Sequence, residues 1–372
     1  MPGRLVALVI KELLAVWRDP RSRMMLIIPP ILQLVVFAYG ANFDVIGAPF
    51  AVLDRDGGPA ARALIDRFAH SSGFHLVRTL TAEAEIAAVV DSREAVMVLG
   101  IPGDFARRLE RRDAAATVSV QVIVDGRMSN TAQILLGYAN AVIDAFNRDW
   151  ADTHGLRRPP SALVPVSWFN PNLVTRWFIV PGLVALLTMV VGLVVTALSV
   201  ARERELGTFE QLLVTPLNPW EIMIGKTLPG LMIGMAQGAA IVLIAQYWFG
   251  VPLLGSSWLL YAGLVTYLLS VIGVGLMVSA LARTQQQAIL GAFLFVTPAI
   301  ILSGFATPIE NMPEWVQFLT LADPVRYFLV IVRGVFLKDL SPALVWAELW
   351  PMGLIAVATL VAAAWLFRRR MY

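Results

Sequence analysis

The 372-residue sequence has no cysteine and only three histidines, which narrows the chemistry open to it. Without cysteine there can be no disulfide, no thiol nucleophile and no thiolate metal ligand. The histidines are His70, His75 and His154, all in polar segments. His70 and His75 flank Ser71-Ser72-Gly73, which is a loop rather than a helical metal-ligand spacing. We therefore expect no metal site.

Charged residues are also scarce. They make up 15% of the chain against 58% hydrophobic residues, and the mean hydropathy is +0.71. Soluble domains contain about 25% charged residues, so this composition indicates an integral membrane protein. The net charge of +3 is small for this length. The pI near 9.4 therefore indicates basic loops on one side of a membrane, and no nucleic-acid partner is expected.

No nucleotide-binding motif is present in the sequence. Gly225-Lys226-Thr227 resembles the end of a phosphate loop, but the motif needs a glycine at position 220, which is Trp220. We interpret Lys226 as an anchor at the membrane interface. Leu302-Ser303-Gly304 is followed by Phe305 and is not a nucleotide-signature loop. No Ser, His and acid grouping suggests a nucleophile, so we expect no enzyme and no cofactor bound by this chain.

Long uncharged runs predict a polytopic α-helical membrane protein with six transmembrane helices, because about 20 apolar residues cross a bilayer. The runs are Met24–Phe43, Trp177–Ala201, two within Thr227–Ala282 that separate around residues 250–257, Thr284–Ile309 and Leu349–Phe367. These runs contain no Asp, Glu, Lys, Arg or His. That absence argues against an ion-coupled carrier, which normally holds an ionisable group inside the membrane.

Residues 1–43 combine a surface helix with the first span. Apolar residues within 4–17 recur at helical spacing, which predicts an amphipathic helix on the membrane surface. A cleaved signal peptide is the alternative for the following run. The long basic region and Pro29–Pro30 within the run favour a retained helix.

Residues 44–176 differ in character and predict an α/β domain with a proline-rich return linker at 154–172. Apolar segments at 50–53, 74–80, 95–101 and 116–124 predict strands, and they alternate with helical patterns at 59–69, 82–90, 103–112 and 129–148. Such alternation is typical of an α/β fold.

The basic residues predict the orientation. They concentrate in 1–23, in 202–226, at Arg283 and in 368–370. Because short cytoplasmic segments carry excess Lys and Arg, both termini are expected inside and the α/β domain outside. The five-helix region 177–372 also contains residues 306–348, which are punctuated by proline. We expect them to be re-entrant or interfacial helices at the outer face.

A charged interruption, Arg202–Glu221, separates the second and third predicted spans. Thr208 and Gln211 have the spacing of a capping box, and Pro216 and Pro219 would end a short amphipathic helix. The segment is either a docking element or an ordinary solvated loop.

Gly230, Gly234 and Gly238 repeat every four residues in the third span. Such a face lets helices approach closely, either within this chain or at a dimer seam.

Several motifs together resemble those of one known family. They are Arg18-Asp19-Pro20-Arg21, Pro29–Pro30, Ala51-Val52-Leu53-Asp54, Glu203 to Leu217, Leu302-Ser303-Gly304-Phe305, Pro308, Met312-Pro313, Pro324 and Arg333-Gly334. With these motifs the whole chain resembles the permease subunits of ABC exporters of the ABC-2 type, in the subgroup with a large external domain. The Glu203–Leu217 segment is the most specific of them.

The resemblance implies a half-transporter of the bacterial cytoplasmic (inner) membrane that dimerises with a second copy or a paralogue. A separate cytoplasmic ATPase would bind ATP and Mg²⁺, and a periplasmic adaptor and membrane lipid are further candidate partners. The cargo would be amphipathic or hydrophobic small molecules, as for multidrug exporters. The residues that the resemblance assigns to an ATPase-coupling helix at 202–221 are Arg202, Glu203, Arg204, Glu205, Gly207, Thr208, Phe209, Glu210, Gln211 and Leu212.

A second hypothesis is a membrane-anchored sensory protein whose α/β domain binds a ligand outside. Its weakness is that the predicted cytoplasmic segments include no output domain.

Overall fold

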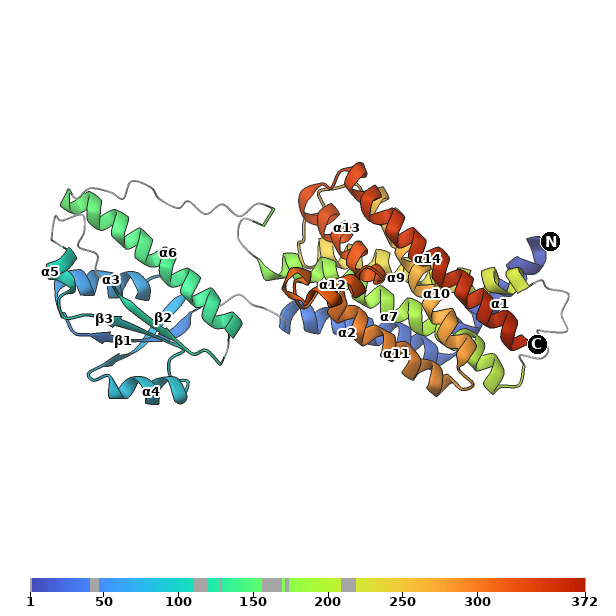
Figure 1. The fold of residues 1–372 in the computed structure, drawn as a ribbon, viewed down its shortest axis with the longest axis horizontal. Coiled ribbons are helices and arrows are strands. Elements are labelled where there is room, and N and C mark those ends of the chain that lie inside the picture. The colour runs from blue at the N-terminus through green and yellow to red at the C-terminus, as the bar shows by residue number, and fades with distance from the viewer. Residues whose placement is uncertain are drawn as a thin grey trace. The chain divides into compact units, whose positions relative to one another are not determined.

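The computed structural model divides the chain into two compact units, which are described separately here (Figure 1). One unit joins Met1–Asn42 to Ser167–Tyr372, and the other is Phe43–Val166. The structure describes all residues except 1, 41–46, 110–118, 128, 156–168, 171–173, 209–218 and 372. The predicted linker 154–172 therefore lies mostly outside the described residues.

The first unit is helical and is built around one long helix. Its elements are α1 (Pro2–Arg18), α2 (Pro20–Gly40), α7 (Thr175–Glu205), α9 (Pro219–Tyr247), α10 (Ser257–Leu281), α11 (Gln285–Leu302), the 3₁₀ turn η1 (Ile309–Asn311), α12 (Glu314–Thr320), α13 (Pro324–Lys338) and α14 (Pro342–Met371). Helix α7 is apolar on all sides from Ile179 to Ala201 and mostly buried. It packs against α2, α9, α10, α11 and α13.

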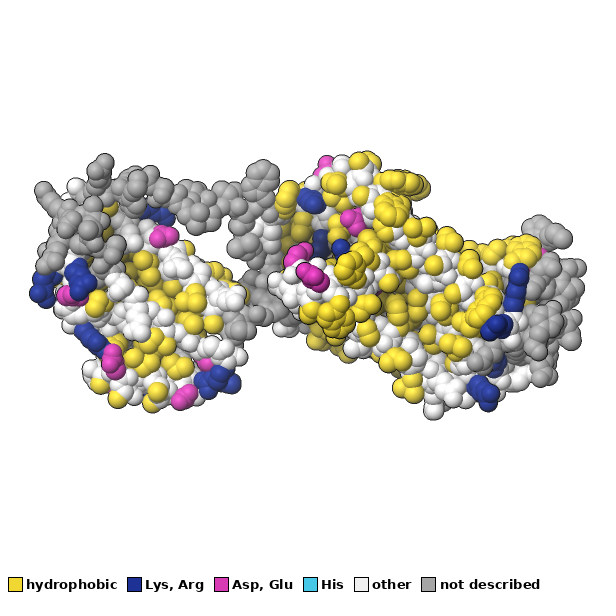
Figure 2. Space-filling view, in the orientation of Figure 1, with side chains coloured by type: hydrophobic (Ala, Val, Ile, Leu, Met, Phe, Trp, Pro, Cys, Tyr) yellow, Lys and Arg dark blue, Asp and Glu magenta, His cyan; other side chains and the backbone are white. Residues whose placement is uncertain are grey.

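Five described helices, α7, α9, α10, α11 and α14, are long and apolar enough to cross a membrane. The pair α12 and α13, bent by 77°, would make a sixth span if it counts as one. Hydrophobic side chains cover most of the helical surface seen in Figure 2. The apolar part of α2, Leu26–Gly40, is shorter than the five spans. The structure thus supports five to six spans by length and composition, and the predicted first span is not among the five.

Several helix boundaries differ from the uncharged runs, and at three of them the helix is longer than its run. Helix α7 continues to Glu205 instead of ending at Ala201, α9 begins at Pro219 rather than near Thr227, and α14 begins at Pro342 rather than Leu349. A hydropathy run ends at its first charge, whereas a helix ends where its backbone is capped.

The uncharged runs consequently leave out ionisable residues that belong to the helices. Helix α9 includes Glu221 and Lys226, and both are buried. Both residues precede Thr227, where the uncharged run begins, so the run could not include them.

The segment predicted as interfacial or re-entrant contains η1, α12 and α13. Helix α13 packs against α7 and α10 and buries Val325, Phe328 and Val332. Asp323 caps its first turn by accepting a hydrogen bond from the Val325 amide at 3.0 Å.

The second unit is an α/β fold with a four-stranded sheet of order β2-β1-β3-β4. The strands are β1 (Ala48–Asp54), β2 (Phe74–Leu80), β3 (Met97–Ile101) and β4 (Gln121–Val124), and the helices are α3 (Pro59–Ala69), α4 (Ala84–Asp91), α5 (Phe105–Leu109) and α6 (Ser129–His154). Strand β1 pairs in parallel with β2 and β3, and β3 pairs antiparallel with β4. The predicted strand–helix alternation agrees with this order, although β4 is shorter than 116–124.

Both faces of the central strand β1 are covered. Phe50 and Val52 join the core that α3 and α6 close, while Ala51 and Leu53 join a smaller core with Val89 of α4. A strand buried on both faces has the continuous apolar sequence seen here.

The glycine repeat of α9 lies between this helix and its neighbours α7 and α10. A Cβ added at Gly230 would lie 2.6 Å from Thr196 Cγ2, one at Gly234 would lie 2.8 Å from Leu268 Cδ2, and one at Gly238 would lie 2.6 Å from Leu264 Cδ2. All these contacts are within the chain, and each is shorter than a normal carbon–carbon contact.

We predict that Gly230→Ala lowers the thermal unfolding midpoint of the detergent-purified protein. The added methyl would overpack the contact with Thr196, at a cost of about 1–3 kcal/mol. Gly353→Ala in α14 is the matched control, because its nearest atom, Thr266 Cγ2, would be 4.0 Å away. That control should leave the midpoint unchanged or raise it, since alanine favours helix. Equal effects of the two changes would contradict the packing argument.

Candidate functional site

The charged turn that ends α7 is closed by a Schellman motif. The Gly207 amide donates to the Arg204 carbonyl at 3.1 Å, and the Thr208 amide donates to the Glu203 carbonyl at 2.9 Å. Gly207 has φ +69°, which favours glycine at this position. The Thr208 hydroxyl also donates to the Glu203 carbonyl, at 3.3 Å. Thr208 therefore terminates α7, whereas the predicted capping bond toward Gln211 would involve residues outside the described range.

Glu203, in this last turn, joins a cluster of charges from three helices. Its Oε1 is 2.7 Å from Nζ of Lys11 in α1, and its Oε2 is 2.9 Å from Nζ of Lys226 in α9. The second contact is an ion pair by distance without an aligned hydrogen bond. Lys226 also lies 3.0 Å from Oε1 of Glu12. We call Lys11, Glu12, Glu203 and Lys226 the charged cluster.

Lys226 and Glu203 of the charged cluster are buried, so each of them requires an oppositely charged partner. The Lys226 side chain is 1% exposed and that of Glu203 is 9% exposed, whereas Lys11 is 56% exposed. An ion removed from water is tolerated only beside an opposite charge and with its hydrogen bonds satisfied. Lys226 meets that requirement with two carboxylates and the Ser199 hydroxyl at 3.2 Å. Two acids and two bases leave the charged cluster neutral overall.

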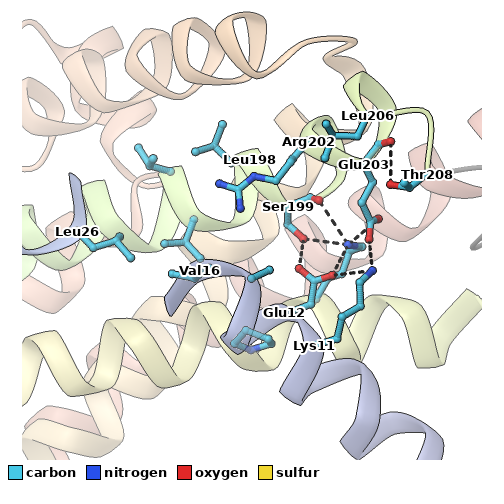
Figure 3. A pocket seen from close by; sticks show the side chains of 15 residues that line it. Lys11, Glu12, Val16, Leu26, Leu198, Ser199, Arg202, Glu203, Leu206 and Thr208 are labelled. Atoms are coloured by element: carbon cyan, nitrogen blue, oxygen red, sulfur yellow. Dashed lines mark hydrogen bonds and ion pairs between the residues drawn. The ribbon is translucent and has the colours of Figure 1, made fainter. Parts of the chain in front are cut away.

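A cavity of about 180 Å³ adjoins the charged cluster (Figure 3). Side chains of α1, α7 and α9 line it, together with Leu26 of α2. Figure 3 shows Lys11, Glu12, Ser199 and Glu203 pointing toward one another, while Arg202 points away toward Leu198. Arg202 Nη2 instead lies 3.7 Å from Oδ2 of Asp19, which lies between α1 and α2.

The two remaining charges of the turn contact two other helices. Arg204 Nη1 donates to the carbonyls of Ala280 and Ala282, at 2.7 and 3.1 Å, and so binds the C-terminal end of α10. Glu205 Oε2 accepts from the backbone amide of Gln285 at 2.7 Å, at the N-terminus of α11. A carboxylate at that position also complements the helix dipole. Four consecutive side chains thus tie the end of α7 to α1, the α1–α2 junction, α9, α10 and α11.

Comparisons with known proteins identify the family. The ABC-2 family transporter protein family matches residues 20–365. The chain belongs to the ABC-2 family. It is 41% identical over 368 residues to the Escherichia coli K12 protein named probable multidrug ABC transporter permease YbhR, with 99% of each chain covered. It is 33% identical over 384 residues to probable multidrug ABC transporter permease YbhS of the same strain, covering 99% of this chain and 97% of YbhS. Inner membrane transport permease YhhJ is 29% identical over 326 residues, covering 87% of this chain and 85% of YhhJ.

The structure locates part of the element that the resemblance assigns to coupling. In this ABC-2 permease, Arg202 to Glu205 are the last turn of α7 rather than part of a separate helix. Phe209, Glu210, Gln211 and Leu212 lie outside the described residues, so their predicted role stays a prediction.

Sequence reasoning missed Lys11 and Glu12 and misassigned Lys226. Lys226 is a buried member of the charged cluster rather than an interfacial anchor. One signal was available, because Glu12 falls on the same helical face as Leu8 and Val16 in an otherwise apolar stripe. A carboxylate on a face that should be buried requires a cation from another element.

We predict that Lys226→Met destabilises the permease by about 3 kcal/mol, because it leaves one buried and one largely buried carboxylate, 9% and 13% exposed, beside a single half-exposed cation. The measurement is the thermal unfolding midpoint in detergent. Lys11→Met is the matched control, and because Lys11 is half exposed its loss should cost below about 1 kcal/mol. Equal thermal unfolding midpoints for the two variants would show that the buried pairing of Lys226 does not stabilise the protein.

Proposed function

We propose that this chain is the transmembrane subunit of an ATP-driven exporter that moves amphipathic or hydrophobic small molecules, drug-like or lipid-like, out across the bacterial inner membrane. Family membership and the relatives named as probable multidrug ABC transporter permeases support the class. The observation that carries the proposal is the set of polar contacts from Glu203, Arg204 and Glu205 to neighbouring helices.

In this proposal, a separate cytoplasmic ATPase binds ATP and Mg²⁺, and it contacts the connection between α7 and α9. This connection begins at Leu206 and ends before Pro219. When the ATPase moves the connection, the last turn of α7 moves with it. Glu203 then transmits the displacement to α1 and α9, Arg204 to α10, and Glu205 to α11. Because helices are rigid over several turns, a shift at one end is carried into the membrane region.

The proposed topology places both termini and the α7–α9 connection in the cytoplasm and the α/β unit outside. The basic residues at the chain ends and near this connection support it. A second copy or a paralogue would complete the transport path, while membrane lipid surrounds the apolar helices. The α/β unit would then be available to a periplasmic adaptor.

Docking can be tested by co-purification. We predict that Glu210→Lys combined with Leu212→Asp abolishes pull-down of the co-expressed ATPase, because it reverses one charge and places another on an apolar position of the proposed contact. Membrane insertion, checked by fractionation, should not change. Asp104→Lys with Leu136→Asp, in the α/β unit, is the control for two equivalent changes elsewhere. Normal ATPase recovery with the first variant would rule out this docking element.

Transmission can be tested separately from docking. We predict that Arg204→Met leaves ATPase pull-down intact but uncouples α10 from α7, so that the two helix ends no longer move together when ATP binds, because the contacts to Ala280 and Ala282 are lost. The chain has no cysteine, so introduced cysteines carry spin labels without background. Leu281→Cys in α10 and Leu206→Cys after α7 are suitable label sites, being 50% and 66% exposed. The distance between the labels should stay constant with ATP in the otherwise unaltered protein and should change with ATP in Arg204→Met.

Arg148→Met in the α/β unit is the control for this measurement and should keep the label distance constant with ATP. A label distance in Arg204→Met that stays constant with ATP would show that the α7–α10 contact does not transmit motion.

A further inference from the structure

Arg333 of α13 lies between two aromatic rings from other elements. Its guanidinium carbon is 3.9 Å from the ring centroid of Phe178, in the first turn of α7. It is 5.6 Å from the ring centroid of Phe305, which follows α11. Aromatic faces attract a guanidinium and cover its flat surfaces, while its N–H groups remain directed outward in its plane.

The absence of a side chain at Gly182 makes this arrangement possible. Gly182 is one turn after Phe178 on α7, and a Cβ there would lie 2.5 Å from Phe305 Cε2 and 3.5 Å from Arg333 Nη2. Any larger residue would displace the Phe305 ring. The site is therefore built from α7, α13 and the segment after α11, rather than from one flexible side chain on a surface.

Among the described residues, the Arg333 guanidinium has no anionic partner. Nε and Nη2 of Arg333 are buried and donate to no protein atom. No carboxylate in the described part of the chain forms an ion pair with Arg333. Arg326, on the same helix, instead donates to the Thr320 hydroxyl. Buried charged donors without an acceptor are costly, which points to a partner that the described residues do not supply.

We propose that Arg333, Phe178 and Phe305 form a binding site for the anionic head group of an amphipathic molecule, a phosphate or a carboxylate. Nε and Nη2 occupy one edge of the guanidinium, and this edge matches two oxygens of such a group. Phe178 is 44% exposed, so its side of the site reaches the surface of the helical unit. The apolar rings suit the chain that adjoins the head group.

An anionic membrane lipid and an anionic cargo molecule share this chemistry, and the site does not depend on the proposed export function. The test uses the full-length chain in a neutral detergent and measures bound molecules by native mass spectrometry. The probes are phosphatidylglycerol, dodecyl phosphate and, as the neutral comparison, a diacylglycerol with the same acyl chains as the phosphatidylglycerol.

We expect the unaltered protein to bind at least one anionic probe about tenfold more tightly than diacylglycerol, a difference of about 1.4 kcal/mol. Arg333→Gln should lose this preference, and Arg333→Lys should keep part of it, because lysine retains the charge but not the two-donor edge. Arg326→Gln is the matched control and should bind as the unaltered protein does. Equal anion binding by Arg333→Gln and the unaltered protein would overturn the site.

Competition then separates the two sources of the anion. If phosphatidylglycerol stays bound in excess dodecyl phosphate, the site binds a membrane lipid. If dodecyl phosphate displaces it, the site binds a single-chain amphiphile. If Arg333→Gln does not fold, added salt provides the test in the unaltered protein. Salt should weaken anion binding but not diacylglycerol binding, and salt-independent anion binding would contradict the proposal.

Discussion

A helix that is buried along most of its length can end in charged residues only if its neighbours supply their partners. Helix α7 is such a helix, and its last turn reads Arg-Glu-Arg-Glu. Each of these side chains has an oppositely charged or backbone partner on a different element. The positions of α1, α9, α10 and α11 near this turn therefore depend on one another, because each contributes a partner that the others cannot replace.

This dependence has a mechanical consequence. Lys226 of α9 is paired with both Glu12 of α1 and Glu203 of α7. If α1 and α7 separated at this point, the buried Lys226 cation would lose at least one of these two partners, which is costly. Small movements that keep the pairs intact are far less costly than movements that break them. The end of α7 is consequently suited to move as one body with the helices tied to it, which is what a coupling element requires.

The sequence was sufficient to predict the features that depend on local pattern. Uncharged runs located the central parts of α7, α10 and α11, and strand–helix alternation located the elements of the α/β unit, because both patterns depend on neighbours within a few residues. Helix ends were less predictable, since the Schellman closure at Gly207 is set by backbone geometry rather than by hydropathy. The resemblance directed attention to Arg202–Glu205 without indicating their partners.

Those partners lie far away in the sequence, and local pattern could not identify them. Lys11 and Lys226 are 192 and 23 residues from Glu203 and approach it only after three helices pack. Glu12 on an apolar stripe indicated that some cation was needed but not which one.

Two buried cations in the helical unit, Lys226 and Arg333, are both removed from water but have different partners. Lys226 is neutralised by carboxylates of α1 and α7, so its charge holds the helices together. Arg333 is held by aromatic rings, without a carboxylate among the described residues. Removing the cation from water is costly at both places. A stable fold does not require the charge of Arg333, because an apolar side chain of similar size would pack between Phe178 and Phe305 without that cost. Because packing does not require the charge of Arg333, we attribute this charge to the binding of an anionic ligand.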